Sequence, residues 1–585
     1  RADFQLTSDT TCTITVDGCK PQTYRRWDSR KGIFAYLPAD NTPPAPCDYR
    51  TDTTVVRGYL PNAKNQQFDI IYDSVLDDTE QCRLSAQTDS TGLFEVRLPL
   101  SGRTEVIFIN RHQHLGFEMW LTPKETYFVC LQHDTPGLMG ADSRLSLEMD
   151  HAPERAFNAS PLSCQYPNEP DDSTVLNEIR KAITQCEANL DSMLKAHPNL
   201  SAGFRQMAKE LIGHSALRGL GEQMYETPVE GREQTLPGIV QLTDSLLATL
   251  PAIPCFISDD YDSFWNWYST YQDYLANRHG RMTLNAPLLE QTIARYLTDF
   301  QMPDSIAQLF DRIETLKSEL DHTSTENNVK RAIYDSLHFR VYEALDRIPE
   351  FHKASLDLWK IMNLQSNWRN FDAMQLPTSR KDYAEARSTM EALRQSHTAL
   401  PEYIFNEAMS RVQEPGLRDI LARQQEAYRP TDFDYQGSLQ SNDIVTGLTD
   451  GQEILKRILA PFRRKIVYTD IWGSWCTPCK HDMKNYAPVV KEALKGRDVI
   501  FLYFANRTPD ASWKQIIKEY GCVGPQTVHY NLPAEQQEAV ERILLNQGYP
   551  SYGLFDKNGR LVTKDAPRPY EQDRLVRTIE ELLRK

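Results

Sequence analysis

No apolar run in the sequence approaches the roughly 20 residues that a membrane-spanning helix needs. The longest run, near Val499–Ala505, has the length of a strand. Positive charge is also scarce, because 65 Lys and Arg stand against 80 Asp and Glu and leave a formal net charge of −15. Phosphate binding requires a basic face, which this balance does not favour. We therefore expect a chain that does not span a membrane and has no nucleic-acid partner.

Cysteine is sparse as well. Eleven Cys in 585 residues do not make a disulfide scaffold, and an odd number leaves at least one thiol unpaired. Near the N-terminus, a Cys12–Cys19 bridge across a hairpin and half-buried free thiols on an edge strand fit the sequence about equally. The chain begins at Arg1 without a visible signal peptide, which fits a processed exported protein as well as a shortened chain.

Composition and hydrophobic period divide the chain into five consecutive segments. They are an N-terminal β extension at 1–50, a small antiparallel β domain at 51–133, a linker at 134–173, a helical domain at 174–430 and an α/β domain at 431–585. The predicted fold class is therefore multidomain: an all-β sandwich or barrel, then an all-α domain, then an α/β fold.

The alternation of side chains supports the β domain. Phe94, Val96 and Leu98 point to one face of a predicted strand, while Glu95 and Arg97 point to the other. The helical domain shows the longer period instead. Its first helix carries an apolar stripe and should end before His197-Pro198. The stripe consists of Leu176, Ile179, Ile183, Cys186, Leu190 and Met193.

An aromatic stripe lies further along the helical domain, at Phe264, Trp267, Tyr268, Tyr271 and Leu275. Such a face can form a peptide groove, but a helix–helix core is the ordinary interpretation of this spacing. No fixed-period repeat is visible, so a solenoid is not supported.

The residues with the clearest chemistry are Cys476 and Cys479. Lys465–Ile471 reads as a buried strand, after which Trp475-Cys476-Thr477-Pro478-Cys479 opens a helix. Two thiols at that junction can close and reopen a small disulfide ring. The first lies where unpaired N–H groups and the helix dipole favour a thiolate, and the second faces back into the protein and can resolve a mixed disulfide.

A C-x-x-C pair also occurs in zinc sites, which need a second pair of Cys or His at comparable spacing. None follows here, and the loop histidines His112 and His114 lack a matching acidic or cysteine cluster. We therefore predict neither a metal nor a cofactor.

The rest of the α/β domain supplies a recognisable order of elements. After the strand at 465–471 we predict a helix at 478–494, a strand at 498–505, helices at 508–521 and 533–546, a hairpin of 551–555 with 560–563, and a closing helix at 571–584. With the redox pair at the first strand-to-helix junction, this order resembles the thioredoxin fold. From about Gln440 onward it is similar to TlpA/ResA-type thiol–disulfide oxidoreductases of bacterial envelopes.

The resemblance implies roles for individual residues. Cys476 matches the exposed nucleophile and Cys479 the buried resolving thiol. Pro550 matches a proline that is cis in this fold and lets the backbone of Tyr549 pair with an extended substrate. Asp470 matches a buried acid thought to deprotonate the resolving thiol. For Asp470, a strand-end carboxylate satisfied by backbone N–H groups is an equally weighted interpretation.

Other positions near the pair have lesser implied roles. Trp475 should shield the disulfide and contact partners, while Thr477 and Pro478 influence the reduction potential. The family usually carries a proline where this chain has Lys484, and Pro488 comes a turn later, so the helix kink should move.

Two further residues near the pair have competing interpretations. His481 is predicted to be a solvated residue, although it could tune the thiolate. Cys522 is predicted to be an unreactive packed thiol, with a third redox thiol as the alternative.

We therefore expect an enzyme that reduces disulfides of exported proteins and is recharged by a membrane thiol-reductant system. The resemblance extends, in pattern only, to multidomain envelope proteins of Gram-negative anaerobes, which implies the periplasm or cell envelope and leaves a lipid anchor open. Two alternatives remain: a thiol peroxidase, whose upstream Thr and Pro arrangement is missing before Cys476, and a partner- or ligand-binding envelope protein in which the thioredoxin-like part is an accessory.

Overall fold

The computed structural model describes most of residues 39–160, 172–268, 302–319 and 330–374, all of 376–584, and three strands near the N-terminus. Contacts between residues divide the chain into two compact units. The first comprises Arg1–His352, Ile361–Glu391 and Glu402–Ala422, and the second comprises Lys353–Lys360, Ala392–Pro401 and Arg423–Lys585. The second unit thus contains three segments of the predicted helical domain, namely Lys353–Lys360, Ala392–Pro401 and the last residues of that domain from Arg423 onward. The division of the chain into five segments stays a prediction.

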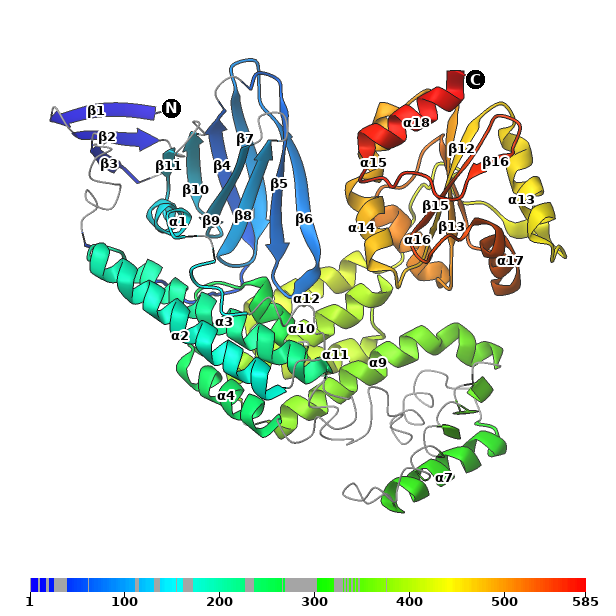
Figure 1. Ribbon diagram of the computed structural model, residues 1–585, viewed down its shortest axis with the longest axis horizontal. Helices are drawn as coiled ribbons and strands as arrows, with labels where there is room; N and C mark the ends of the chain where they lie inside the picture. The colour runs from blue at the N-terminus through cyan, green and yellow to red at the C-terminus, as the bar shows by residue number, and fades with distance from the viewer. Residues whose placement is uncertain are drawn as a thin grey trace. The chain divides into compact units, whose positions relative to one another are not determined.

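The first unit begins with three small sheets (Figure 1). A three-stranded antiparallel sheet consists of β1 (Ala2–Ser8), β2 (Thr11–Val16) and β3 (Gln22–Arg25). Two four-stranded sheets follow, with strand orders β11-β10-β4-β7 and β6-β5-β8-β9. Their strands are β4 (Asp52–Tyr59), β5 (Gln67–Ser74), β6 (Asp77–Gln87), β7 (Leu93–Leu100), β8 (Thr104–Asn110), β9 (Leu115–Leu121), β10 (Thr126–Cys130) and β11 (Gly137–Met139).

Side chains from both four-stranded sheets form one core, which makes this part a sandwich. Phe94, Val96 and Leu98 of β7 are buried in it, together with Phe108 of β8, so the predicted alternation is confirmed. The prediction of a purely antiparallel domain is wrong at one place, because β10 pairs with β4 in parallel. Strands β5 to β9 separate these two in sequence, and the intervening chain returns β10 in the direction of β4.

Helices complete the first unit. They include α1 (Ser143–Asp150), α2 (Asp172–Ala196), α3 (Ala202–Glu226), α4 (Leu236–Thr249), α7 (Asp304–Glu319) and α11 (Glu402–Arg411), with parts of α9 (Pro349–Ala373), α10 (Thr378–Ser396) and α12 (Pro415–Ala427). The segment predicted as a linker contains β11 and α1. The predicted stripe of α2 is buried at Leu176, Ile179, Cys186 and Leu190, and the helix ends before His197-Pro198 as expected. Of the aromatic stripe, Phe264 and Tyr268 are buried and stack at 5.1 Å.

The second unit contains a five-stranded sheet of order β14-β13-β12-β15-β16. Its strands are β12 (Ile466–Trp472), β13 (Val499–Ala505), β14 (Thr527–Tyr530), β15 (Ser551–Phe555) and β16 (Leu561–Thr563). β12 is the central strand, parallel to β13 and antiparallel to β15. The predicted α/β character and the strands at 465–471, 498–505 and 551–563 are therefore confirmed, whereas β14 was not predicted.

Helices cover both faces of this sheet (Figure 1). Tyr468 and Tyr503 face a core formed with α14 (Thr477–Asn485), α15 (Ala487–Ala493), α16 (Asp510–Glu519) and α18 (Gln572–Arg584). Val467 and Leu502 face the opposite core, with α13 (Gly451–Leu459) and α17 (Ala534–Leu544). Two short 3₁₀ helices flank α13, at Asn442–Val445 and Ala460–Phe462. No helix of the described residues is both long and apolar enough to cross a bilayer.

The helix predicted at 478–494 is broken into α14 and α15. Tyr486 separates the two, and Pro488 lies in the first turn of α15. Proline has no N–H to donate, and its ring clashes with the carbonyl oxygen four residues earlier, here that of Lys484. The kink therefore lies where the displaced proline predicts it.

Candidate redox site

The predicted redox pair, Cys476 and Cys479, lies where β12 passes into α14. Cys476 and Cys479 are joined by a disulfide, with their Cα atoms 5.3 Å apart. Cys476 is the N-cap of α14, and its Sγ accepts a hydrogen bond of 3.3 Å from the Cys479 N–H. Pro478 occupies the first turn, where its missing N–H costs no helical hydrogen bond. On reduction, a Cys476 thiolate would lie on the positive end of the helix dipole, which lowers a thiol pKa.

The Cys476 sulfur is less accessible than the resemblance implied. Its residue is only 4% exposed, and Cys479 is fully buried in the same core. The expectation of an exposed nucleophile is therefore wrong, because the N-cap geometry turns the side chain of Cys476 toward the helix end. Trp475, Thr477 and Pro478 around it are exposed.

Trp475 and Tyr549 form an aromatic pair beside the disulfide. Their rings meet edge to face at a centroid distance of 4.8 Å, and the Trp475 indole donates to the Asn506 carbonyl at 3.2 Å. The Tyr549–Pro550 peptide bond is cis. Ser551, the next residue, pairs with Ile471 at the end of β12. The structure thus brings Trp475, Tyr549 and Pro550 to the same end of the sheet as the redox pair.

Asp470 lies on β12, on the sheet face that carries α14. It is 2% exposed, and its Oδ1 has no hydrogen-bond partner among the described residues. Burial raises the Asp470 pKa well above its ordinary value, the nearby Asp482 carboxylate raises it further, and Lys491 and Arg568 oppose this. The alternative interpretation, a carboxylate satisfied by backbone N–H groups, does not hold for that oxygen.

Asp482 is a site residue that the sequence reasoning missed. It lies on α14, is 2% exposed and accepts hydrogen bonds from the Tyr552 hydroxyl at 2.8 Å and from Arg568 at 2.9 Å. Tyr552 is in turn the cross-strand partner of Asp470. The spacing of Asp482 in the sequence was a usable signal, because residues three apart in a helix share a face and Asp482 comes three residues after Cys479.

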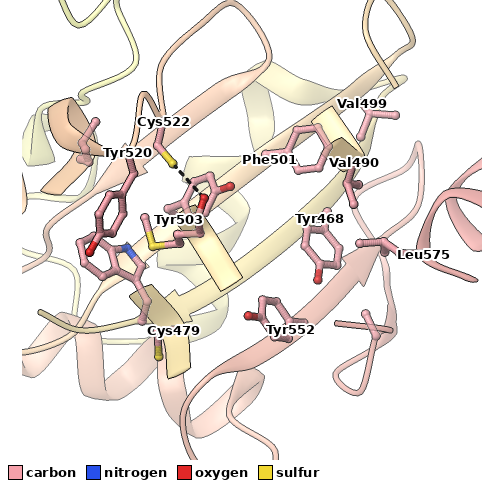
Figure 2. Close-up of a cluster of buried hydrophobic side chains, with 14 of the residues drawn as sticks. Tyr468, Cys479, Val490, Val499, Phe501, Tyr503, Tyr520, Cys522, Tyr552 and Leu575 are labelled. Atoms are coloured by element: carbon pink, nitrogen blue, oxygen red, sulfur yellow. Dashed lines mark hydrogen bonds between the residues drawn. The ribbon is translucent and has the colours of Figure 1, made fainter. Parts of the chain in front are cut away.

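Other polar side chains line the same face of the sheet. Asp470, Tyr503 and His529 are register partners across β12, β13 and β14. The Tyr503 ring stacks on the His529 ring at a centroid distance of 4.6 Å, and the Lys491 ammonium lies 4.8 Å from the centre of the Tyr503 ring. Figure 2 shows Tyr468, Tyr503 and Tyr552 projecting into the core that also holds Cys479 and Cys522.

Two neighbouring residues have the ordinary environments predicted for them. Cys522 is buried, and burial raises its thiol pKa, which disfavours a reactive thiolate. His481 is exposed, and its ring meets Tyr486 at 5.3 Å. Within the described residues, no group of three or more His, Cys, Asp or Glu could hold a metal ion. His112, His114 and Cys19 lie outside the described residues.

No protein-family model matches the chain. A segment of 132 residues is 30% identical to the thiol–disulfide oxidoreductase ResA of Bacillus thuringiensis (strain Al Hakam), and to that of Bacillus anthracis. About a fifth of the chain is similar to thiol–disulfide oxidoreductases. The alignment covers 22% of this chain and 66% of ResA, which is less than two thirds of that relative.

Similar solved structures cover the same share of the chain. The thioredoxin domain of a thiol–disulfide oxidoreductase from Bacteroides vulgatus is 22% identical, covers 21% of this chain and 84% of its own, and gives a TM-score of 0.19. The exposed lipoprotein thioredoxin of Streptococcus pneumoniae is 24% identical and covers 21% and 90%, with a TM-score of 0.18.

Proposed function

We propose that the second unit is a thiol–disulfide oxidoreductase whose Cys476–Cys479 pair reduces disulfides of exported proteins. The observation that carries this proposal is the disulfide at the N-terminus of α14, with the Cys479 N–H donating to the Cys476 sulfur. The same hydrogen bond would stabilise a Cys476 thiolate once the pair is reduced. The similarity to ResA supports the same activity.

The reaction transfers two electrons by two exchanges. The Cys476 thiolate attacks one sulfur of the target disulfide, which forms a mixed disulfide and releases the other target sulfur as a thiolate. Cys479 then loses its proton and attacks the Cys476 sulfur, which closes the intramolecular disulfide and releases the second target thiolate. The dithiol is oxidised, the target is reduced, and the two protons of the dithiol end on the target thiols.

Asp470 is the proposed acceptor of the Cys479 proton. A buried carboxylate whose pKa is raised well above its ordinary value by burial can take the proton and return it to the leaving target. Trp475 and Tyr549 are proposed to contact the target, with Pro550 positioning the Tyr549 backbone. Thr477 and Pro478 lie between the two cysteines and are proposed to adjust the reduction potential.

The oxidised pair must then be recharged. We propose a membrane thiol-reductant system as the electron source and the periplasm or cell envelope as the compartment, with a lipid anchor as one form of attachment. These proposals rest on the resemblance to envelope oxidoreductases. One similar solved structure is itself described as an exposed lipoprotein.

The test uses the full chain with Cys479→Ser. This variant retains the attacking sulfur and lacks the resolving one, so mixed disulfides with target proteins should accumulate at Cys476. Cys522→Ser is the matched control, because it removes a buried thiol of the same core and should turn over normally. If the Cys479→Ser chain traps no protein in cells where a trapping thioredoxin variant does, the proposed turnover is wrong.

A second candidate function, partner or ligand binding, is favoured by one observation in the first unit. A cavity of about 500 Å³ there is lined by Glu105, Glu118, Trp120 and Arg155 among others. If this unit selects targets, Glu118→Lys at the exposed part of the lining should change which proteins the Cys479→Ser chain traps.

A thiol peroxidase has no such support, because the residues before Cys476 are Gly473, Ser474 and Trp475 and lack the Thr and Pro arrangement of peroxidatic sites. A peroxide-consumption assay distinguishes this activity from disulfide reduction.

A further inference from the structure

Lys480, the residue that follows Cys479, is held inside the protein rather than in solvent. It is 9% exposed, and its ammonium donates to Nε2 of His397 at 3.2 Å. A buried ammonium needs a polar partner, because desolvation of the charge is costly. His397 thus fixes a positive charge in the first turns of the helix that begins at the redox pair.

His397 comes from the segment Ala392–Pro401, which precedes the thioredoxin-like sequence but belongs to the same compact unit. It is fully buried and has a left-handed backbone with φ 49°. Its Nδ1 lies 2.9 Å from the Glu519 carboxylate on α16 and 3.3 Å from the Tyr428 hydroxyl. Arg394 approaches Glu519 at 3.5 Å.

These contacts define where the protons of the ring lie. Because a carboxylate can only accept, we assign the ring proton to Nδ1, which donates to Glu519, and Nε2 is left as the acceptor for the Lys480 ammonium. A doubly protonated His397 would direct an N–H at that ammonium, which is repulsive. The arrangement therefore fits a neutral His397 and a charged Lys480, joined to the negative charge of Glu519.

We infer that His397 is a positioning residue for the Cys476–Cys479 couple and acts through Lys480. Lys480 is four residues after Cys476, so the two share one face of the helix, and the Lys480 N–H bonds to the Cys476 carbonyl at 3.1 Å. A fixed positive charge there favours the Cys476 thiolate and hence the reduced pair. This inference rests on the proposed redox function and adds a residue from outside the thioredoxin-like sequence to it.

The test is a double-mutant cycle on the full chain, with Lys480→Met and His397→Leu. Two quantities are measured: the pKa of Cys476, from alkylation rate against pH, and the equilibrium constant of the couple in glutathione buffers. Each single variant should raise the Cys476 pKa and shift the equilibrium constant about three- to tenfold toward the disulfide, the larger value being about 30 mV. In the double variant, the Cys476 pKa and the equilibrium constant should change no more than they do in Lys480→Met alone.

Two variants separate positioning from a merely structural role. His397→Gln keeps an acceptor for the ammonium and should restore most of the wild-type equilibrium constant. His481→Gln changes an exposed histidine next to Lys480 and should change neither quantity. If His397→Leu does not fold, Lys480→Met still tests the charge, with Lys480→Arg as its conservative partner.

The inference is overturned if folded Lys480→Met leaves both quantities unchanged, or if the two single effects add fully. If the wild-type pair cycles with glutathione and the variants have the same Cys476 pKa and equilibrium constant, this inference is wrong and the proposed function is retained. A wild-type pair that cannot be cycled would overturn the proposed function and this inference with it.

Discussion

Tyr552 of β15 donates a hydrogen bond of 2.8 Å to Asp482 of α14 and so joins the sheet to the helix that carries the redox pair. Asp482 also accepts from Arg568, and Tyr552 is the cross-strand partner of Asp470. The tyrosine therefore lies between two buried carboxyl groups, one paired and one with an unpartnered oxygen. We therefore expect that loss of the hydrogen bond to Asp482 destabilises the fold, whereas replacement of Asp470 by a neutral residue stabilises it at high pH.

Tyr552→Phe should lower the free energy of unfolding more than Tyr468→Phe does. The two rings stack at 5.6 Å in the same core, but Tyr468 donates to the neutral carbonyl of Pro567, whereas Tyr552 donates to a carboxylate. Hydrogen bonds to charged groups contribute about 1.5–3 kcal/mol and neutral ones about 1 kcal/mol. Urea denaturation of both variants measures the difference. Equal losses, or a larger loss for Tyr468→Phe, would contradict the account of Asp482.

Asp470→Asn should slow target reduction at neutral pH by about tenfold or more, since a positioned general base commonly contributes about 10² or more. The step affected is attack by Cys479, so mixed disulfide with Cys476 should be longer lived. Single-turnover reduction of a protein disulfide across pH measures this. A variant with the wild-type rate at every pH would show that Asp470 does not accept the proton.

The same variant should be more stable than the wild type at pH 8. Because the pKa of Asp470 is raised in the fold, the carboxyl group contributes fully to stability below its ordinary pKa of 3.8, and this contribution is lost as the pH rises. Asparagine has no charge to desolvate, so its melting temperature should exceed that of the wild type at pH 8 and approach it near pH 3.5. Asp498→Asn, at an exposed position before β13, is the control substitution.

Local spacing predicted much of this site, and β14 and His397, which were not predicted, depend on long-range contacts. The strand, the redox pair and the displaced kink at Pro488 all follow from neighbours within about ten residues. α13 was also readable, since Ile454, Leu455 and Ile458 lie on one helical face and Asp450 caps the helix, but its spacing was overlooked.

β14 could not be predicted in the same way. It is four residues long, contains Thr527 and His529, and is defined by its pairing with β13. His397 was out of reach for the same reason, because 83 residues separate it from Lys480. Nothing in the local sequence of either residue indicates that the two meet.

Gly473→Ala should weaken binding of protein targets without abolishing chemistry. A Cβ at Gly473 would lie 2.5 Å from Nε1 of Trp475, so the indole must move and lose its hydrogen bond to Asn506. Trp475 is 48% exposed and has room to do so. The KM for a protein disulfide should therefore rise several-fold, with kcat and the reduction of a small disulfide nearly unchanged.

Gly496→Ala is the matched control for that substitution. Gly496 has a φ of 74° and no atom within 4 Å of the added Cβ, so alanine there should cost about 1 kcal/mol of stability through backbone strain alone. Its KM should equal that of the wild type. If KM rises for both Gly473→Ala and Gly496→Ala, the cause is destabilisation of the fold, and Trp475 has no role in target binding.

Glu105→Gln should stabilise the first unit at pH 8 and have little effect near pH 4. Burial, then the carboxylates of Glu118 and Asp73, raises the pKa of Glu105 from 4.5 to about 7. The carboxyl group therefore contributes fully below about pH 4.5, and its contribution is lost as the pH rises through 7, by up to about 3 kcal/mol. Thermal unfolding from pH 4 to pH 8 measures this, with the exposed Glu125→Gln as control. The difference in stability between Glu105→Gln and the wild type should widen between pH 5 and pH 8. A constant difference would show that Glu105 ionises in the fold as it does in the unfolded chain.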